Sequence, residues 1–260
     1  MSVSQNGKII LISISLYLLW TLGTYLLEGR IKTFLRPEDM TARIVYITIV
    51  NLVIGIILSG MVLRYMASSK FIELSQAGLR SAQHSFLAVL AALVLGLLSY
   101  FLQSPPSSNP AIIVNAFFQV LTVTIAEILV CWAVIGSTFE SLFQGKGKFL
   151  SLLVPIVMSS VLFGVYHFAH SPPFNTLRMV IFLTVIGVLT GLFFFVSRNL
   201  YGTIVFHNFF GIKGVIEALD KAGKLPKYEH LVLPIFINAA IFIGVLLAVH
   251  LLLLNPEFNN

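Results

Sequence analysis

Residues 115–136, NAFFQVLTVTIAEILVCWAVIG, decide the fold class of this chain. The run is long enough to cross a membrane as a helix, which takes about 20 apolar residues. Its one carboxylate is Glu127, and no Lys or Arg stands between Glu127 and either end of the run. Because an ionised carboxylate is costly in hydrocarbon, we predict that Glu127 is functional and has polar partners on other helices. The alternative is a protonated structural carboxyl group that hydrogen-bonds to a neighbouring helix.

The composition of the whole chain indicates an integral membrane protein. Apolar residues make up 58% of the 260 positions and charged residues only 10%, whereas soluble domains are about 25% charged. The fold class that we predict is an all-α polytopic membrane protein, since helices satisfy their own backbone hydrogen bonds in lipid. The net charge of +6 comes from basic residues scattered over short loops. We therefore expect contacts with membrane lipids and no nucleic acid.

Apolar runs bounded by charge, Pro or Gly predict about eight transmembrane helices in one bundle, forming a single transmembrane domain over residues 1–260. The first run is expected to be a retained span, since no small-residue cleavage pattern follows it. The connectors 28–43 and 64–85 mix apolar and charged residues and are predicted to be short helices at the membrane interface. The eight runs are 9–27, 44–63, 86–103, 111–136, 149–170, 177–197, 200–216 and 231–254.

The fourth and fifth runs can form a helical hairpin. Residues 137–144 keep a helical pattern of apolar residues, and Gly145, Lys146, Gly147 and Lys148 then form the turn. Glu127 lies 19 residues before Lys146, and His167 lies 21 residues after it. At about 1.5 Å per residue, both side chains lie close to 30 Å from the turn, so antiparallel packing would bring them to one level.

A Glu and a His at one level can activate water. Burial disfavours the charged carboxylate, and a neighbouring imidazole can hold a water molecule against it, so that Glu127 and His167 form a general base for hydrolysis. His207, in the seventh run, can donate a hydrogen bond to the oxyanion that forms when water attacks a peptide carbonyl. A single His in a span is also often a packing residue. We assign His170 and His250 to the membrane interface or to packing.

A metal site is the competing chemical interpretation. Glu127, His167 and His207 would supply a Glu/His/His set of the kind found in catalytic zinc sites. The sequence has no H-E-x-x-H helix and no obvious second carboxylate to orient the imidazoles. The lone Cys131 excludes a multi-cysteine cage. We therefore expect no cofactor, with zinc as the alternative.

These residues resemble the CPBP family of intramembrane proteases (CAAX prenyl protease and bacteriocin-processing, or abortive-infection, proteins). The family pattern is E-E-x-x-x-R in one transmembrane helix, F-x-x-x-H in the next and H-x-x-x-N/D in a later one. Glu127 opens EILVCW, His167 ends FGVYH and His207 opens HNFFG, and these three residues are spaced 40 positions apart. The resemblance covers about residues 110–216. It implies an integral, multi-pass endopeptidase of a prokaryotic plasma or internal membrane that acts on a peptide or membrane-protein substrate. In this family the Glu and the first His are thought to activate water, and the last motif contacts the oxyanion.

Three positions depart from the family pattern. Ile128 stands in place of the second Glu, Trp132 in place of the Arg, and Gly211 in place of the Asn or Asp. Asn208 lies about 100° around the helix from His207, so it cannot replace the missing amide at Gly211 without distortion. The second hypothesis is therefore a non-catalytic CPBP-like membrane scaffold that binds a lipid, a pigment or a partner helix. A transporter is the third, although the chain shows no internal repeat.

Overall fold

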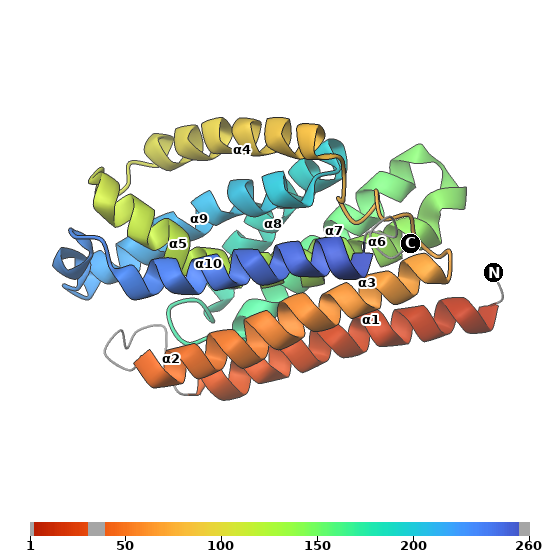
Figure 1. Cartoon of the computed structure of the whole chain (residues 1–260), viewed down its shortest axis with the longest axis horizontal. Helices are drawn as coiled ribbons and strands as arrows, with labels where there is room; N and C mark the ends of the chain where they lie inside the picture. Colours follow the sequence, from red (N-terminus) through yellow and green to blue (C-terminus); the bar gives the residue numbers. More distant parts are fainter. Residues whose placement is uncertain (1–2, 31–39, 255–260) are drawn as a thin grey trace.

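The computed structural model describes residues 3–30 and 40–254, and every regular element within these ranges is a helix. Figure 1 shows α4 along one edge of the bundle and α1 along the opposite edge. The α-helices are α1 (Val3–Thr24), α2 (Met40–Tyr46), α3 (Ser59–Ser68), α4 (Ala82–Leu102), α5 (Pro110–Glu127), α6 (Ser137–Phe143), α7 (Lys148–Tyr166), α8 (Leu177–Ser197), α9 (Leu200–Lys221) and α10 (Leu233–Ala248).

Wider, π-helical segments extend or join several of these helices. Four such segments occur in the part of the chain that the structure describes. They are Tyr25–Gly29 after α1, Ile47–Leu58 between α2 and α3, Ile128–Gly136 between α5 and α6, and Val249–Leu254 after α10. Helix α5 therefore continues without a break through α6, so Glu127 lies inside one long helix.

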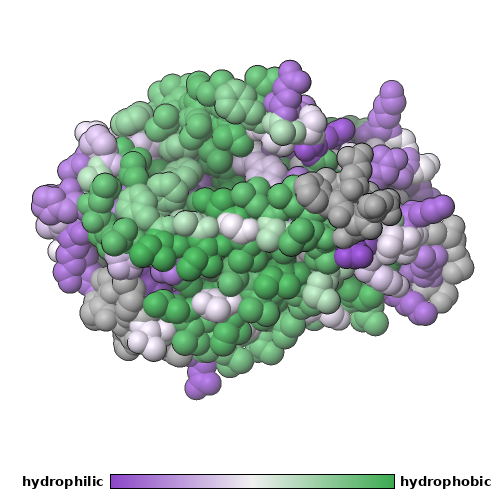
Figure 2. Space-filling view, in the orientation of Figure 1, coloured by the Kyte–Doolittle hydropathy of each residue, from purple (hydrophilic) through white to green (hydrophobic). Residues whose placement is uncertain are grey.

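The predicted membrane fold is confirmed. Seven helical stretches in the described residues are long and apolar enough to cross a membrane. The eighth predicted span, 200–216, forms α9, which is equally long but carries Lys213, Glu217 and Asp220 near its end. Figure 2 shows apolar side chains over the middle of the visible face, with hydrophilic side chains gathered at both ends. This distribution is what a bilayer requires of a bundle that spans it.

The stretch from residue 115 to residue 136 lies at the centre of the bundle. Within the helix Pro110–Lys146, 94% of the apolar stretch is buried, against 22% to 50% in the other six spans. Segment Ile47–Leu58 packs against α5, and a Cβ on Gly55 would lie 2.3 Å from the Ala126 Cβ. Gly55 thus lets this segment approach α5 directly beside Glu127.

The predicted hairpin is also present. Helix α6 ends at Phe143, and a 3-10 turn, Gln144–Lys146, leads to Gly147. Gly147 has φ 96°, a conformation that glycine adopts without steric cost. Helix α7 then packs back against α6 and against segment Ile128–Gly136.

The prediction of an interfacial helix over residues 64–85 is wrong. Helix α3 ends at Ser68, residues 69–81 contain no helix, and Phe71 and Ile72 are buried. The Ser69 hydroxyl donates to the Tyr65 carbonyl at 2.7 Å, and hydroxyl bonds of this kind compete with helix continuation. The apolar side chains of this connector pack inward instead of lying on the membrane surface.

The prediction of an interfacial helix over residues 28–43 is wrong at both ends of this range. Residues 28 and 29 continue the first helix, with Glu28 fully buried, and residues 40–43 already belong to α2. The intervening part, residues 31–39, lies outside the described residues.

Candidate active site

Glu127, His167 and His207 line one cavity of about 250 Å³. Glu127 ends α5, His167 begins a 3-10 turn directly after α7, and His207 lies in the middle of α9. All three are buried, with 6%, 7% and 4% of their surface exposed. The structure therefore brings the three predicted residues together inside the bundle, away from lipid.

The Glu127 carboxylate faces both imidazoles. Its Oε1 lies 3.7 Å from His167 Nε2, and its Oε2 lies 3.4 Å from His207 Nε2. The first distance is too long for a direct hydrogen bond, and polar groups at such a distance are commonly joined by a water molecule. The carboxylate thus has a separate oxygen for each imidazole.

The F-x-x-x-H spacing fixes the orientation of His167. Its Nδ1 donates to the Phe163 carbonyl, one helical turn earlier, at 2.8 Å. A neutral imidazole carries one hydrogen, so Nε2 is left as an acceptor on the side of Glu127. The Phe163 ring also stands edge-on to His167 and to His207, with ring centroids 4.7 and 4.9 Å apart. One turn of helix therefore supplies both the hydrogen bond and the packing that hold the two histidines.

His207 is held by Thr190 of α8, which the sequence analysis missed. Thr190 Oγ1 lies 2.7 Å from His207 Nδ1 and donates its hydrogen to the Ile186 carbonyl at 3.0 Å. Since the hydroxyl has only one hydrogen, it accepts from His207 Nδ1. Thr184 and Thr190 both lie in the apolar run of α8, and the sequence pattern does not distinguish them. The contact between Thr190 and His207 could therefore not be predicted from the sequence.

His170, which the sequence assigned to the interface or to packing, also belongs to the cavity wall. It is buried and stacks on His167 with ring centroids 5.1 Å apart. Its Nδ1 lies 3.1 Å from Glu28 Oε2, while the Ser171 backbone N–H and hydroxyl donate to the same carboxylate at 2.8 and 2.5 Å. His170 Nε2 has no hydrogen-bond partner among the described residues. The sequence did contain one indication of this pair. Glu28 directly follows the first apolar run, and the first helix continues past Glu28 to Gly29.

His250 keeps the packing role assigned to it. Its Nδ1 lies 2.5 Å from the Tyr201 hydroxyl, and it is not among the described residues that line the cavity. The contact joins the last span to the start of α9.

A metal ion would find a different ligand set from the one that the sequence suggested. One ligand atom each from Glu127, His167 and His170 lie within 4.8 Å of one another. Glu28 stands behind His170, which is how carboxylates orient metal-binding imidazoles. His170 thus takes the place of His207 in the set that could hold a metal.

The three departures from the family pattern are packed into the structure. Ile128 and Trp132 are fully buried, and the Trp132 ring lies against Phe163 and His207. A Cβ on Gly211 would meet Val120 Cγ1 at 2.7 Å, so a larger side chain needs Val120 to move. Ile128 and Trp132 therefore fill their positions with apolar contacts, whereas Gly211 lines the cavity beside Val120.

Asn208 has a structural role beside the site. It accepts a hydrogen bond from Thr124 Oγ1 at 3.0 Å and donates to the Phe117 carbonyl at 2.9 Å. Both partners belong to α5, so Asn208 joins α9 to α5. Asn208 is not among the described residues that line the cavity.

Comparison with known proteins agrees with the motif resemblance. Residues 109–212 match the family model for type II CAAX prenyl endopeptidase, Rce1-like proteins. No protein of curated function and no solved structure matches the chain. The matched segment begins just before α5 and ends in α9, so it contains Glu127, His167 and His207, while α1 to α4 lie outside it. Over residues 109–212 the chain is therefore similar to the Rce1-like proteins of the CPBP family, a family of CAAX-type membrane proteases.

Proposed function

We propose that the protein is an intramembrane endopeptidase in which Glu127 and His167 activate water and His207 binds the oxyanion. The observation that carries this proposal is the Glu127 carboxylate, which faces His167 Nε2 with one oxygen and His207 Nε2 with the other in a single cavity. A water molecule beside the 3.7 Å gap would contact Glu127 and His167 together.

In the chemical step, the water oxygen attacks the peptide carbonyl carbon while Glu127 takes a proton from the water. The carbonyl oxygen becomes an oxyanion, and donors placed at that oxygen lower the barrier. Glu127 then passes its proton to the leaving amine, as a general base does when it reverses its role. The C–N bond breaks, and the products are a new carboxylate and a new amine.

The contact with Thr190 determines which nitrogen of a neutral His207 ring carries the hydrogen. Because Nδ1 is committed to donating to Thr190, Nε2 carries a hydrogen only when the ring is an imidazolium. Glu127 Oε2 lies 3.4 Å from this nitrogen. In the proposed mechanism His207 therefore has to be an imidazolium in order to donate to the oxyanion, and charged donors form the stronger hydrogen bonds.

The cavity wall suits an apolar peptide segment. Met179, Phe182 and Leu183 of α8 line it, and Phe182 is 52% exposed on the outside of the bundle. Lys213 and Glu217 of α9 line the same cavity and form an ion pair at 2.6 Å. A substrate could enter between α8 and α9, with its apolar side chains on α8.

The test is cleavage of a panel of membrane peptides, including prenylated C-terminal peptides, by the purified protein and by Glu127→Gln. The amide keeps the shape of the side chain but cannot act as a base, so activity should fall by at least 100-fold. Glu73→Gln, at an exposed carboxylate, is the matched control and should keep full activity. Full cleavage by Glu127→Gln would reject the mechanism. Loss of activity with a chelator, restored by zinc, would establish the metal alternative in its place.

A non-catalytic scaffold is the second candidate, favoured by the apolar packing at Ile128 and Trp132 and by the engagement of Asn208 with α5. In that case the same cavity would hold a lipid, a pigment or a partner helix. No cleavage of any peptide in the panel by the unaltered protein, with a lipid or pigment retained through purification and lost on His207→Phe, would establish this function.

A further inference from the structure

A second pocket, about 170 Å³ in volume, lies between α2, α5 and the loop before α10, apart from the cavity that holds Glu127. We propose that it binds the phosphate group of an anionic phospholipid. The proposal is independent of peptidase activity, since the two cavities share no described lining residue. Its described lining residues are Arg43, Ile44, Ile47, Phe118, Gln119, Thr122, Lys227, Tyr228, Val232, Ile235 and Asn238.

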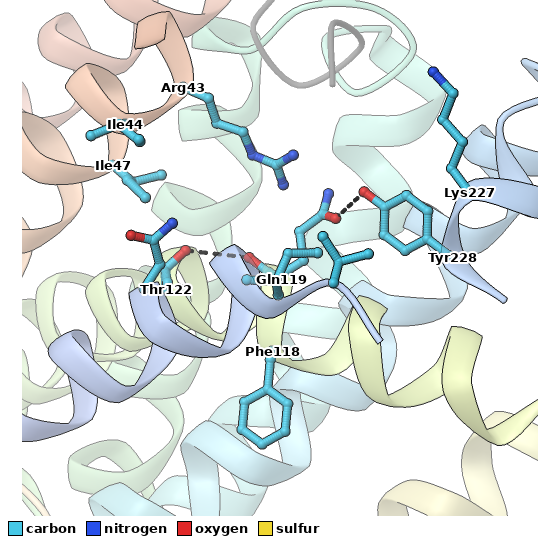
Figure 3. Close-up of a pocket in the computed structure, with 11 residues that line it drawn as sticks. Arg43, Ile44, Ile47, Phe118, Gln119, Thr122, Lys227 and Tyr228 are labelled. Carbon is cyan, nitrogen blue, oxygen red and sulfur yellow. Dashed lines mark hydrogen bonds between the residues drawn. The ribbon is translucent and has the colours of Figure 1, made fainter. Parts of the chain in front are cut away.

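Two cations and no acidic side chain stand among the described residues that line this pocket. Figure 3 shows Arg43 and Lys227 on either side of the Gln119 amide, with the Arg43 guanidinium directed toward it. The side chain of Arg43 forms no ion pair or hydrogen bond with any described residue. A guanidinium and an ammonium with no carboxylate between them in the described part of the pocket favour an anionic ligand.

Gln119 adds a fixed donor to the pocket. It is 94% buried, since only 6% of its surface is exposed, and the Tyr228 hydroxyl donates to its Oε1. With the oxygen occupied, the amide NH₂ group is the part of Gln119 left for a ligand, and it has no hydrogen-bond partner among the described residues. Figure 3 shows this nitrogen on the side of Arg43. The buried floor of the pocket therefore also presents a hydrogen-bond donor.

Helix α5 holds the Lys227 side of the pocket in place. Asn115, one turn before Gln119, donates to the carbonyls of Tyr228 and His230 at 2.9 and 2.8 Å and accepts from the Val232 N–H at 3.0 Å. The loop that carries Lys227 is thus tied to α5 by four side-chain hydrogen bonds, counting that of Tyr228. The cationic site is built into the fold and does not depend on a free loop.

The position and the walls of the pocket identify the ligand class. Arg43 lies at the start of the span Thr41–Ser68, and Lys227 lies just before the span Leu233–Leu254, so both stand where lipid phosphates lie. Ile44, Ile47 and Ile235 also line the pocket, and Ile44 and Ile237 are 43% and 51% exposed. The pocket takes a headgroup phosphate, while the acyl chains lie outside it on these exposed isoleucines.

The experiment measures lipid binding to the full-length protein, purified in detergent and stripped of lipid, by native mass spectrometry. We expect phosphatidylglycerol to bind at least ten-fold more tightly than phosphatidylcholine. Arg43→Gln and Lys227→Gln should remove this preference. Gln119→Glu should also remove it, because the carboxylate still accepts from Tyr228 but repels the phosphate. Arg178→Gln removes an exposed cation that lines neither pocket, and it should bind like the unaltered protein.

A parallel thermal-unfolding arm with inorganic phosphate and no added lipid separates the two sources of the ligand. Phosphate stabilisation that Arg43→Gln abolishes, without any preference for phosphatidylglycerol, would assign the site to free phosphate and overturn the lipid assignment. Equal phosphatidylglycerol binding by the unaltered protein, Arg43→Gln and Gln119→Glu would overturn the site itself. The same holds if Arg178→Gln loses as much binding as Arg43→Gln, because binding would then depend only on total charge.

Discussion

His207 depends on a single hydroxyl group, that of Thr190. Thr190→Val keeps the shape of the side chain but removes the acceptor for His207 Nδ1, so the ring loses the contact that sets its orientation and tautomer. For imidazoles that bind a metal, removing such an orienting partner typically costs about 10- to 100-fold in metal affinity or activity. We expect a loss of about this size in the turnover number of peptide cleavage, with Thr190→Ser keeping most of the activity. Equal loss in the Val and Ser variants would show that packing, and not the hydroxyl, is what matters.

Gly211 shows why the family pattern cannot be restored one residue at a time. A Cβ at this position meets Val120 Cγ1 at 2.7 Å, so Gly211→Asn alone should lower stability by about 1–3 kcal/mol through overpacking. Combining it with Val120→Ala removes the clashing methyl group and allows the Asn amide into the cavity. We expect the double variant to cleave peptides faster than the unaltered protein, whereas Val120→Ala alone should not. Activity that is unchanged in the double variant would show that Gly211 does not limit catalysis.

Helices α7 and α8 approach closely through two glycines. A Cβ on Gly164 would lie 1.9 Å from Thr184 Oγ1 and 3.0 Å from the Val180 carbonyl, and a Cβ on Gly187 would lie 3.0 Å from Ser160 Cα. Small residues at such contacts allow the van der Waals packing that holds helices together in lipid. Gly164 also lies between Phe163 and His167, so the same close contact positions the histidine.

Gly164→Ala should therefore reduce both stability and activity. Overpacking of this kind costs about 1–3 kcal/mol, and the separation of α7 from α8 would move His167 away from Glu127. The measurement is thermal unfolding in detergent together with peptide cleavage. Gly244→Ala on α10 is the control, since nothing lies within 4 Å of a Cβ there, and it should be neutral or stabilising. A similar response of the two variants would count against close α7–α8 packing.

Across the molecule, Glu28 ties the first span to the candidate active site. It receives two hydrogen bonds from Ser171 and pairs with His170, although 143 residues separate Glu28 from Ser171. Since the family match covers residues 109–212, this contact joins a region outside the match to the wall of the cavity. The first span is thus part of the support of the site.

Glu28→Gln should weaken that support. The amide replaces one acceptor oxygen by an NH₂ group, which faces the Ser171 donors and leaves one of them unsatisfied. Hydrogen bonds to charged groups contribute about 1.5–3 kcal/mol each, so the unfolding temperature should fall, and cleavage should fall with it because His170 stacks on His167. Glu73→Gln, at an exposed site, should change neither. An unfolding temperature equal to that of the unaltered protein would show that Glu28 contributes little.

The sequence by itself determined the class of fold and the positions of Glu127 and His167 along the lengths of their helices. Span length and the rise per residue are local properties, so the antiparallel hairpin that brings Glu127 and His167 together could be predicted from spacing alone. The same reasoning placed Gly147 in the turn and carried the helix beyond residue 136. The resemblance to the CPBP family also implied that His207 would join the pair, and the structure places His207 Nε2 3.4 Å from Glu127 Oε2.

Only the tertiary structure decided which residues support Glu127, His167 and His207. In a membrane helix the buried and the lipid-facing sides are both apolar, so the sequence does not show how each helix is rotated about its axis. Thr190 therefore could not be distinguished from Thr184, the pairing of His170 with Glu28 was not foreseen, and residues 64–85 were predicted to form an interfacial helix. The Glu28 and Ser171 contacts depend on the crossing of helices far apart in the chain, which no local pattern encodes.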